Sequence, residues 1–243
     1  MKILGLNKTT LLDYPSRVAC TIFLGGCNFR CPFCHNKDIV LASENIGEYT
    51  QDSIFAFLKK RKGILTGVCI TGGEPTIHSD LPDFIDAIKQ LGYKVKLDTN
   101  GSNPAMLSTL ITNKLIDYCA MDIKNCPQKY DTSVSFSTSP ISAKYDINEI
   151  RQSVEILLSQ PCSDECGFSY EFRTTLVKEL HAEADIRAIC EWITGANAYY
   201  LQSYTESDGV FCKNFHAHDE ETLAHFEHIC QTYITNTHLR GVS

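Results

Sequence analysis

The sequence predicts an α/β fold in which parallel strands and their connecting helices form a partial (β/α)6 barrel. Short apolar runs alternate with helical segments of about 10–15 residues, a pattern typical of right-handed βαβ units on a parallel sheet. Polar and charged residues recur at the carboxyl ends of the predicted strands, where barrels form their active-site face. No internal repeat and no long linker divides the 243 residues, so we expect a single domain over 1–243.

The predicted strands are short runs rich in β-branched and apolar residues. The first reads RVACTIFL, which suits a buried strand, and the second, VCIT, ends in two glycines. In chain order, the six predicted strands are 17–24, 68–71, 94–98, 118–123, 169–177 and 198–202.

The predicted helices carry apolar residues at helical spacing, as at Phe84, Ile85 and Ile88. A proline opens the third helix, because the first helical position needs no backbone N–H. In chain order, the six predicted helices are 51–62, 81–91, 104–111, 147–158, 183–193 and 219–233.

Composition argues against several classes of protein. Asp and Glu number 29 against 22 Lys and Arg, a net charge of -7, so no broad basic surface is present and we expect no nucleic-acid partner. No stretch approaches the ~18 apolar residues that cross a bilayer, and the first residues contain no apolar leader, so we expect no membrane contact and a cytoplasmic location. Twelve cysteines in such a protein indicate metal binding or catalysis rather than disulfides.

Three of these cysteines are close together in the segment GGCNFRCPFCHN. Cys27, Cys31 and Cys34 have the spacing C-x3-C-x2-C, which lets one loop wrap a single metal centre. A structural zinc ion usually needs four ligands, and His35 cannot easily join an ion that its neighbour Cys34 already binds. A [4Fe–4S] cluster held by three thiolates keeps one iron open for a substrate, so we favour the cluster. A zinc or redox module without enzymatic activity is the alternative.

The segment LLDYPSRVACTIFLGGCNFRCPFCHN, with the aromatic Phe33 before its last cysteine, resembles the radical S-adenosylmethionine superfamily. Within it, the closest resemblance is to the activating proteins of anaerobic ribonucleotide reductases. This resemblance implies a barrel of the radical S-adenosylmethionine type, one [4Fe–4S] cluster on Cys27, Cys31 and Cys34, and S-adenosylmethionine on its open iron. The reduced cluster would give one electron to the sulfonium and release a 5′-deoxyadenosyl radical. Phe33 and the backbone near His35 would pack against adenine.

The segment TGGEP follows the second predicted strand. Gly72 and Gly73 lack a Cβ, so the backbone can approach a ligand closely, and Glu74 offers a carboxylate to the methionine ammonium. Without the cysteine motif, a Gly-Gly pair is more often a turn that ends a strand.

The segments KLDTNG and MDIK end the next two predicted strands. By resemblance to the pyruvate formate-lyase activating enzymes, Asp98, Thr99 and Asp122 would hold a small monovalent cation beside the cofactor carboxylate, which Lys124 would approach. The alternative is that Asp98 and Asp122 only cap strands and pair with Lys96 or Lys124.

Arg173 and Gln202 lie on the last two predicted strands. A buried guanidinium needs an anion or several acceptors, and the resemblance places Arg173 near the ribose or carboxylate of the cofactor. Glu171, on the same face of its strand, is the alternative structural partner of Arg173. Gln202 completes the set of polar residues expected at this end of the barrel.

Other cysteines and histidines are less informative. Cys162 and Cys166 form C-x3-C in a polar loop, but the ferredoxin-like run of about four cysteines that holds an auxiliary cluster is missing. The sequence does not reveal a role for the four histidines around the last helix: His216, His218, His225 and His228.

The resemblance also implies a protein substrate. Activating proteins of this kind take a hydrogen from a backbone glycine of a glycyl radical enzyme, here most directly an anaerobic ribonucleotide reductase, and an incomplete barrel leaves room for the glycine loop. A reduced flavodoxin or ferredoxin would supply the electron. The alternatives are a pyruvate formate-lyase-type activating enzyme, or a radical enzyme that acts on a small molecule, such as a deazapurine synthase.

Overall fold

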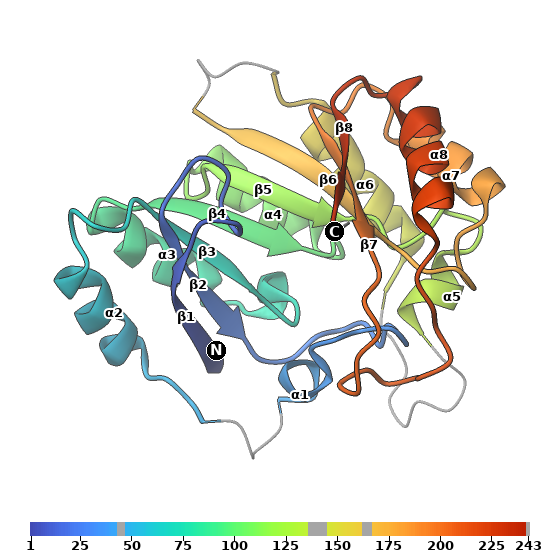
Figure 1. Ribbon diagram of the computed structural model, residues 1–243. Coiled ribbons are helices and arrows are strands. Elements are labelled where there is room, and N and C mark those ends of the chain that lie inside the picture. Colours follow the sequence, from blue (N-terminus) through green and yellow to red (C-terminus); the bar gives the residue numbers. More distant parts are fainter. Residues whose placement is uncertain (43–46, 136–144, 162–166, 242–243) are drawn as a thin grey trace.

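The computed structural model describes residues 1–42, 47–135, 145–161 and 167–241. These residues form an eight-stranded sheet whose strands lie in chain order (Figure 1). The strands are β1 (Ile3–Thr10), β2 (Ala19–Leu24), β3 (Gly67–Gly72), β4 (Lys94–Thr99), β5 (Tyr118–Asp122), β6 (Ser169–Leu176), β7 (Tyr199–Ser203) and β8 (Thr237–Arg240). Strands β2 to β8 pair in parallel, whereas β1 pairs antiparallel with β2. Among the described residues β1 and β8 do not pair, so the sheet stays open and the predicted partial α/β barrel is confirmed.

The six predicted strands correspond to β2 through β7, and the two edge strands are additional. The sequence does not predict β1 because Asn7, Lys8 and Thr9 are polar and exposed, as is common on an edge strand. Strand β8 has only four residues, too few for an alternating pattern to be recognised.

From β2 onward, helices connect successive strands, and the longer ones pack outside the curved sheet (Figure 1). They are α1 (Lys37–Val40), α2 (Gln51–Lys60), the 3-10 turn η1 (Pro75–Ile77), α3 (Leu81–Gln90), α4 (Pro104–Thr112), α5 (Tyr130–Val134), α6 (Ile147–Leu158), α7 (Glu183–Trp192) and α8 (Glu220–Gln231). Local chemistry fixes where they begin: Asn103 caps α4 by accepting a hydrogen bond from Met106 N (3.1 Å), and Asp219 caps α8 by accepting one from Thr222 N (2.8 Å). In the described ranges, no helix has both the length and the apolar character needed to cross a bilayer.

Each parallel strand presents two chemically different faces. On β4, Val95 and Leu97 belong to the hydrophobic core under the helices, whereas Lys96 and Asp98 alternate with them on the inner face. Strand β6 repeats this pattern, with Phe172 in the core. Bulky apolar residues normally fill the interior of a barrel, so charged side chains on the inner face mark it as a place of function.

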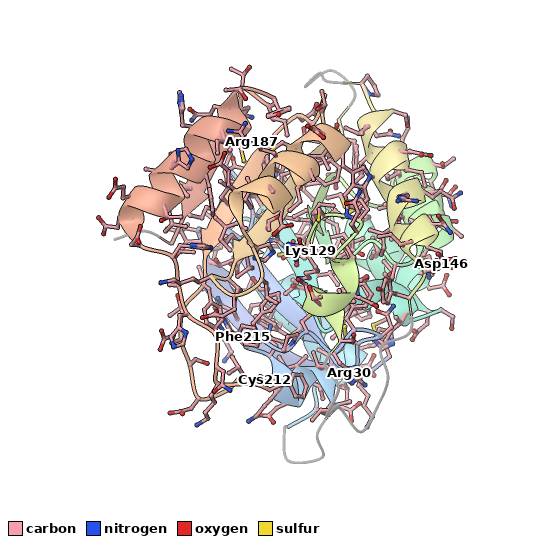
Figure 2. The ribbon with its side chains drawn as sticks, turned by 90° about the vertical axis from the view of Figure 1, so that its right-hand side faces the viewer. Arg30, Lys129, Asp146, Arg187, Cys212 and Phe215 are labelled. Carbon is pink, nitrogen blue, oxygen red and sulfur yellow. The ribbon has the colours of Figure 1, made fainter. Side chains whose placement is uncertain are left out.

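Two long loops meet at the carboxyl ends of the strands. The loop after β2 carries the cysteine segment, and the loop after β7 runs down beside it (Figure 1). Cys212 N donates a hydrogen bond to Pro32 O (2.9 Å), which fixes the two loops together. Figure 2 shows Cys212 and Phe215 of the second loop near Arg30 of the first. Segments far apart in the sequence therefore build this end of the molecule.

Candidate functional site

The carboxyl ends of the strands surround a cavity of about 420 Å³, which lies within the usual range of small-molecule sites, about 300–1,000 Å³. Every candidate site residue from the sequence lines this cavity: Cys27, Cys31, Phe33, Cys34, His35, Gly72, Gly73, Glu74, Asp98, Thr99, Asp122, Lys124, Arg173 and Gln202. The fold therefore brings these residues together, while their individual roles stay predictions.

The cysteine loop places three free thiols in the cavity wall. Burial raises the pKa of Cys27 to about 12, and it also raises the pKa of Cys31 and of Cys34. A bound metal deprotonates such thiols outright. Within the described ranges, no three His, Cys, Asp or Glu side chains lie close enough to share one metal ion. Cysteine thiolates are the usual ligands of iron–sulfur clusters, so the chemistry of these three side chains fits such a cluster, and their role as its ligands stays a prediction.

Arg30 holds the cysteine loop in shape. Its guanidinium donates hydrogen bonds to the carbonyl oxygens of Cys27 and Phe29, both at 2.6 Å, and Phe29 N donates to Cys27 Sγ at 3.3 Å. Arg30 N donates to Val134 O (2.8 Å) at the end of α5. Because Arg30 is only 8% exposed, these bonds offset part of the cost of burying its charge. Sequence reasoning missed Arg30, since an arginine between two cysteines gives no signal of where its side chain points.

Gly72 and Gly73 are required by the packing of the chain itself. A Cβ on Gly73 would lie 1.8 Å from Gly26 O, and a Cβ on Gly72 would lie 2.3 Å from Leu24 O. Gly72 also has a φ of +123°, which other residues rarely adopt. The sequence interpretation, that the missing Cβ atoms admit a ligand, is therefore incomplete: they first let β3 approach the start of the cysteine loop.

Gly73→Ala should displace the cysteine loop, because the new Cβ cannot fit unless Gly26 moves. We expect the free energy of unfolding to fall by about 1–3 kcal/mol, and the protein to retain less iron after anaerobic reconstitution. Denaturant unfolding and iron analysis measure the two effects. Gly47→Ala is the matched control, since a Cβ there meets nothing within 4 Å. Equal stability and iron content in the two variants would contradict this prediction.

Glu74 joins the TGGEP segment to the DTNG segment. Its carboxylate is 1% exposed and accepts hydrogen bonds from Thr76 N (3.0 Å), from Thr99 Oγ1 (2.7 Å) and from Asn100 N (2.6 Å). Burial raises the pKa of Glu74, although these hydrogen bonds oppose the rise. The carboxylate thus already has structural partners, and its predicted contact with a ligand ammonium stays a prediction.

Five charged side chains form an ion cluster on the inner face. Arg173 bridges two carboxylates, since its Nε lies 2.8 Å from Asp122 Oδ1 and its NH1 lies 3.2 Å from Asp98 Oδ2. Lys124 Nζ lies 2.9 Å from Asp122 Oδ2, and Lys96 pairs with Asp98 Oδ1. Burial alone would raise the carboxyl pKa values, but Arg173 and the lysines hold the pKa of both Asp98 and Asp122 below its ordinary value. The pairing with Lys96 and Lys124, which the sequence leaves as an alternative, is therefore present.

Glu171 is the partner of Arg240 rather than of Arg173, so that alternative from the sequence is wrong. The fully buried Glu171 carboxylate lies 2.8 and 3.1 Å from the two terminal nitrogens of Arg240, and it accepts a hydrogen bond from Tyr118 Oη (2.7 Å). The Arg240 guanidinium also lies over the Tyr200 ring, 3.4 Å from its centre. Arg240 belongs to β8, which the sequence does not predict, so this pairing could not be foreseen.

Aromatic side chains from the loop after β7 cover the end of the cysteine motif. Phe33 makes edge contacts with Tyr204 and Phe215, with ring centres 6.4 and 6.5 Å apart. The His35 ring stacks on Tyr204, with centres 5.3 Å apart and planes inclined by 29°. The loop after β7 therefore builds one wall of the site, and no sequence signal marks Tyr204 or Phe215 as part of it.

Two further buried residues connect segments of the site and were missed by sequence reasoning. Asn100 Nδ2 donates a hydrogen bond to Asn28 Oδ1 (3.0 Å), beside the first cysteine, and its place in the DTNG segment was an available signal. His181 Nδ1 accepts a hydrogen bond from Val177 N (3.0 Å), so its Nε2 carries the proton and donates to Lys124 O (3.0 Å). Burial lowers the pKa of His181 to about 4, which keeps the ring neutral at pH 7. No pattern in the sequence indicates this contact.

The remaining candidates contribute no second site in the part of the chain that the structure describes. Cys162 and Cys166 lie outside the described residues. His216 and His225 pair with single glutamates at 2.6 and 2.9 Å, and the His218 ring meets an aromatic ring edge. These contacts account for the three histidines as surface and packing residues.

A comparison with protein families defines the class of this protein. The model of the radical SAM superfamily, named for S-adenosylmethionine, matches residues 21–167. This span covers more than half of the chain and includes the cysteine motif and the TGGEP, DTNG and DIK segments. The chain therefore belongs to the radical SAM superfamily, and membership implies a [4Fe–4S] cluster and S-adenosylmethionine as its ligands.

The chain is also similar in sequence to individual known proteins. Two proteins of Methanocaldococcus jannaschii carry names that assign them provisionally to the glycyl-radical enzyme activating enzymes. One is 30% identical over 245 residues, covering 98% of this chain and 95% of the relative; the other is 24% identical over 231 residues, covering 95% and 79%. A 7-carboxy-7-deazaguanine synthase of Neisseria meningitidis is 34% identical over 111 residues, covering 45% of this chain and 46% of the synthase.

Solved structures support the fold. Streptococcus suis SuiB, bound to its precursor peptide SuiA, has a TM-score of 0.68 at 17% identity and matches 91% of this chain, which spans 48% of the SuiB chain. Escherichia coli QueE has a TM-score of 0.55 at 16% identity, covering 98% of this chain and 93% of QueE. At such identities, the likeness establishes the fold and says nothing about the substrate.

Proposed function

We propose that the protein is an activating enzyme that cleaves S-adenosylmethionine reductively and generates a glycyl radical on the backbone of a partner enzyme, most directly an anaerobic ribonucleotide reductase. The near full-length similarity to relatives named as glycyl-radical enzyme activating enzymes carries this proposal. Two structural features support it: the three thiols line one cavity together with Asp98, Asp122, Lys124 and Arg173, and the sheet is open between β1 and β8 among the described residues, as entry of a protein loop would require.

The residues of this chain bind and orient, while the cluster and the sulfonium of the cofactor, when bound, supply the electron transfer and the 5′-deoxyadenosyl radical. Cys27, Cys31 and Cys34 hold the cluster. Lys124 and Arg173 present positive charge in the cavity, which suits the carboxylate of the methionine moiety.

The remaining cavity residues bind the polar and aromatic parts of the cofactor. Gly72, Gly73 and Glu74 take the methionine ammonium, and Phe33 with the backbone beside His35 takes the adenine. Thr99 and Gln202 offer hydrogen-bonding groups at the strand ends. A reduced flavodoxin or ferredoxin supplies the electron.

The resemblance implies one more group, a small monovalent cation beside Asp98 and Asp122. The carboxylate oxygens that would bind this ion are already engaged, because cationic side chains of this chain pair with all four of them. The ion would have to compete with these side chains. No step of the proposed reaction therefore depends on such an ion.

Electron paramagnetic resonance provides the test. Under reducing, anaerobic conditions, the cluster-loaded protein and S-adenosylmethionine should produce a glycyl doublet in an anaerobic ribonucleotide reductase, and a reductase whose target glycine is replaced by alanine should give none. A doublet in a pyruvate formate-lyase instead would correct the partner and keep the activity. Absence of a doublet in every glycyl radical enzyme tried would overturn the proposal.

A second candidate function is a radical reaction on a small molecule. The partial similarity to a 7-carboxy-7-deazaguanine synthase favours it. In the same assay, this function would give 5′-deoxyadenosine and a modified small molecule without any protein radical. Mass spectrometry that searches the reaction mixture for 7-carboxy-7-deazaguanine, the product named in that relative, separates the two functions.

A further inference from the structure

The ion cluster contains an excess of positive charge. Arg173 contacts one oxygen of Asp98 and one of Asp122, while Lys96 and Lys124 each take the oxygen that remains. Three cationic side chains thus face two carboxylates, and each carboxylate oxygen has a cationic partner. An additional alkali ion between the carboxylates would meet this surplus of positive charge where little water screens it.

Lys96 differs from the other two cations in its position. It lies two residues before Asp98 on β4, its side chain is 2% exposed, and its Nζ lies 3.9 Å from Cys69 Sγ and 5.9 Å from the centre of the Tyr118 ring. Burial lowers the pKa of Lys96, but the Asp98 carboxylate outweighs this effect and the pKa is raised. A thiol and a ring face replace little of the hydration that an ammonium loses, so Asp98 is what keeps Lys96 charged at this depth.

We propose that Lys96 is a built-in substitute for a monovalent cation: its ammonium neutralises Asp98 permanently, so that the protein needs no alkali ion to assemble its cofactor pocket. The proposal rests on the proposed function only in that Asp98 borders the cavity assigned to the cofactor. Lys96 is thereby a positioning residue, which acts through Asp98 on Arg173 and on the shape of the cavity.

The test compares alkali chlorides with N-methylglucamine chloride at equal ionic strength, using the full-length, cluster-loaded protein. The thermal unfolding midpoint of the wild type should be the same in sodium, potassium and N-methylglucamine chloride. Lys96→Met should unfold at a lower temperature in N-methylglucamine and regain about 2–4 °C in sodium or potassium chloride, because an alkali ion can then enter beside Asp98. The same alkali ions should tighten S-adenosylmethionine binding to Lys96→Met, measured by calorimetry.

Lys94→Met is the matched control. Lys94 lies on the same strand and pairs with Asp117, but it is 45% exposed, so its loss removes the same charge without vacating a buried position. This variant should show no preference for alkali ions. The proposal would be overturned if the unfolding midpoint of the wild type changed with the cation more than the midpoint of Lys94→Met does. It would also be overturned if Lys96→Met folded and its midpoint were the same in alkali chlorides and in N-methylglucamine chloride.

Two features keep the test decisive. Where Lys96→Met fails to fold, the wild-type comparison alone separates the outcomes, because a bound alkali ion must raise the wild-type midpoint and a built-in ammonium must not. Thermal midpoints require no cofactor turnover. A wrong prediction about these midpoints is therefore distinguishable from a wrong proposed function, which the glycyl doublet tests.

Discussion

Substituting alanine for any one of Cys27, Cys31 and Cys34 should abolish cleavage of S-adenosylmethionine. Each thiol lines the cavity, and under the proposed function each would hold one iron of the cluster, so its loss would leave that iron without a protein ligand. Iron and sulfide analysis after anaerobic reconstitution should show fewer than about four irons per chain, and chromatography should detect no 5′-deoxyadenosine.

Cys212→Ala is the matched control for these substitutions. Cys212 lies beside the cysteine loop but contacts it through its backbone, whose N donates a hydrogen bond to Pro32 O (2.9 Å). This variant should therefore keep its cluster and its cleavage activity. A Cys31→Ala protein with a full set of irons and undiminished cleavage would refute the assignment of the cluster ligands.

Arg173→Leu should lower the free energy of unfolding by about 2–3 kcal/mol at pH 7, because it removes the bridging partner of two half-buried carboxylates, which are 15% and 27% exposed. The folded-state pKa values of Asp98 and Asp122 lie below those of the unfolded chain, since Arg173 and the lysines outweigh the opposing effect of burial. Their ion pairs therefore stabilise the protein above the ordinary carboxyl pKa of about 4, and this stabilisation is lost as the pH falls below it. The difference between wild type and variant should accordingly shrink in acid.

Denaturant unfolding at pH 7 and at pH 3 measures this difference. Arg187→Leu provides the control, because Arg187 pairs with Glu183 on the surface of α7, where both side chains are nearly half exposed. Its loss should cost at most about 0.5 kcal/mol at either pH. If Arg173→Leu proved as mild as Arg187→Leu, the ion cluster would not hold the inner face together.

The parts of the fold that repeat along the chain could be predicted from the sequence. Strands β2 to β7 are apolar runs with helices between them, and this alternation is enough to define a parallel sheet. The edge strands could not be predicted, because β1 is half exposed and polar and β8 is very short. Edge strands bury less apolar surface, so their sequences carry a weaker pattern.

The site shows the same division between local and long-range information. Residues in the cysteine motif and at the strand ends could be assigned to one site from the sequence, because a parallel sheet places the carboxyl ends of all its strands on one side. Tyr204 reaches His35 through a long loop, and His181 reaches Lys124 across more than fifty positions. Such contacts depend on loop paths, which no local periodicity encodes.

The ion pair between Glu171 and Arg240 bears on how the sheet assembles. The two residues lie 69 positions apart, Glu171 on β6 and Arg240 on the edge strand β8. Without Arg240, the fully buried Glu171 carboxylate loses its paired cation, and a buried carboxylate without a cation is strongly disfavoured. Docking of β8 and burial of Glu171 should therefore occur together, in one cooperative step of folding.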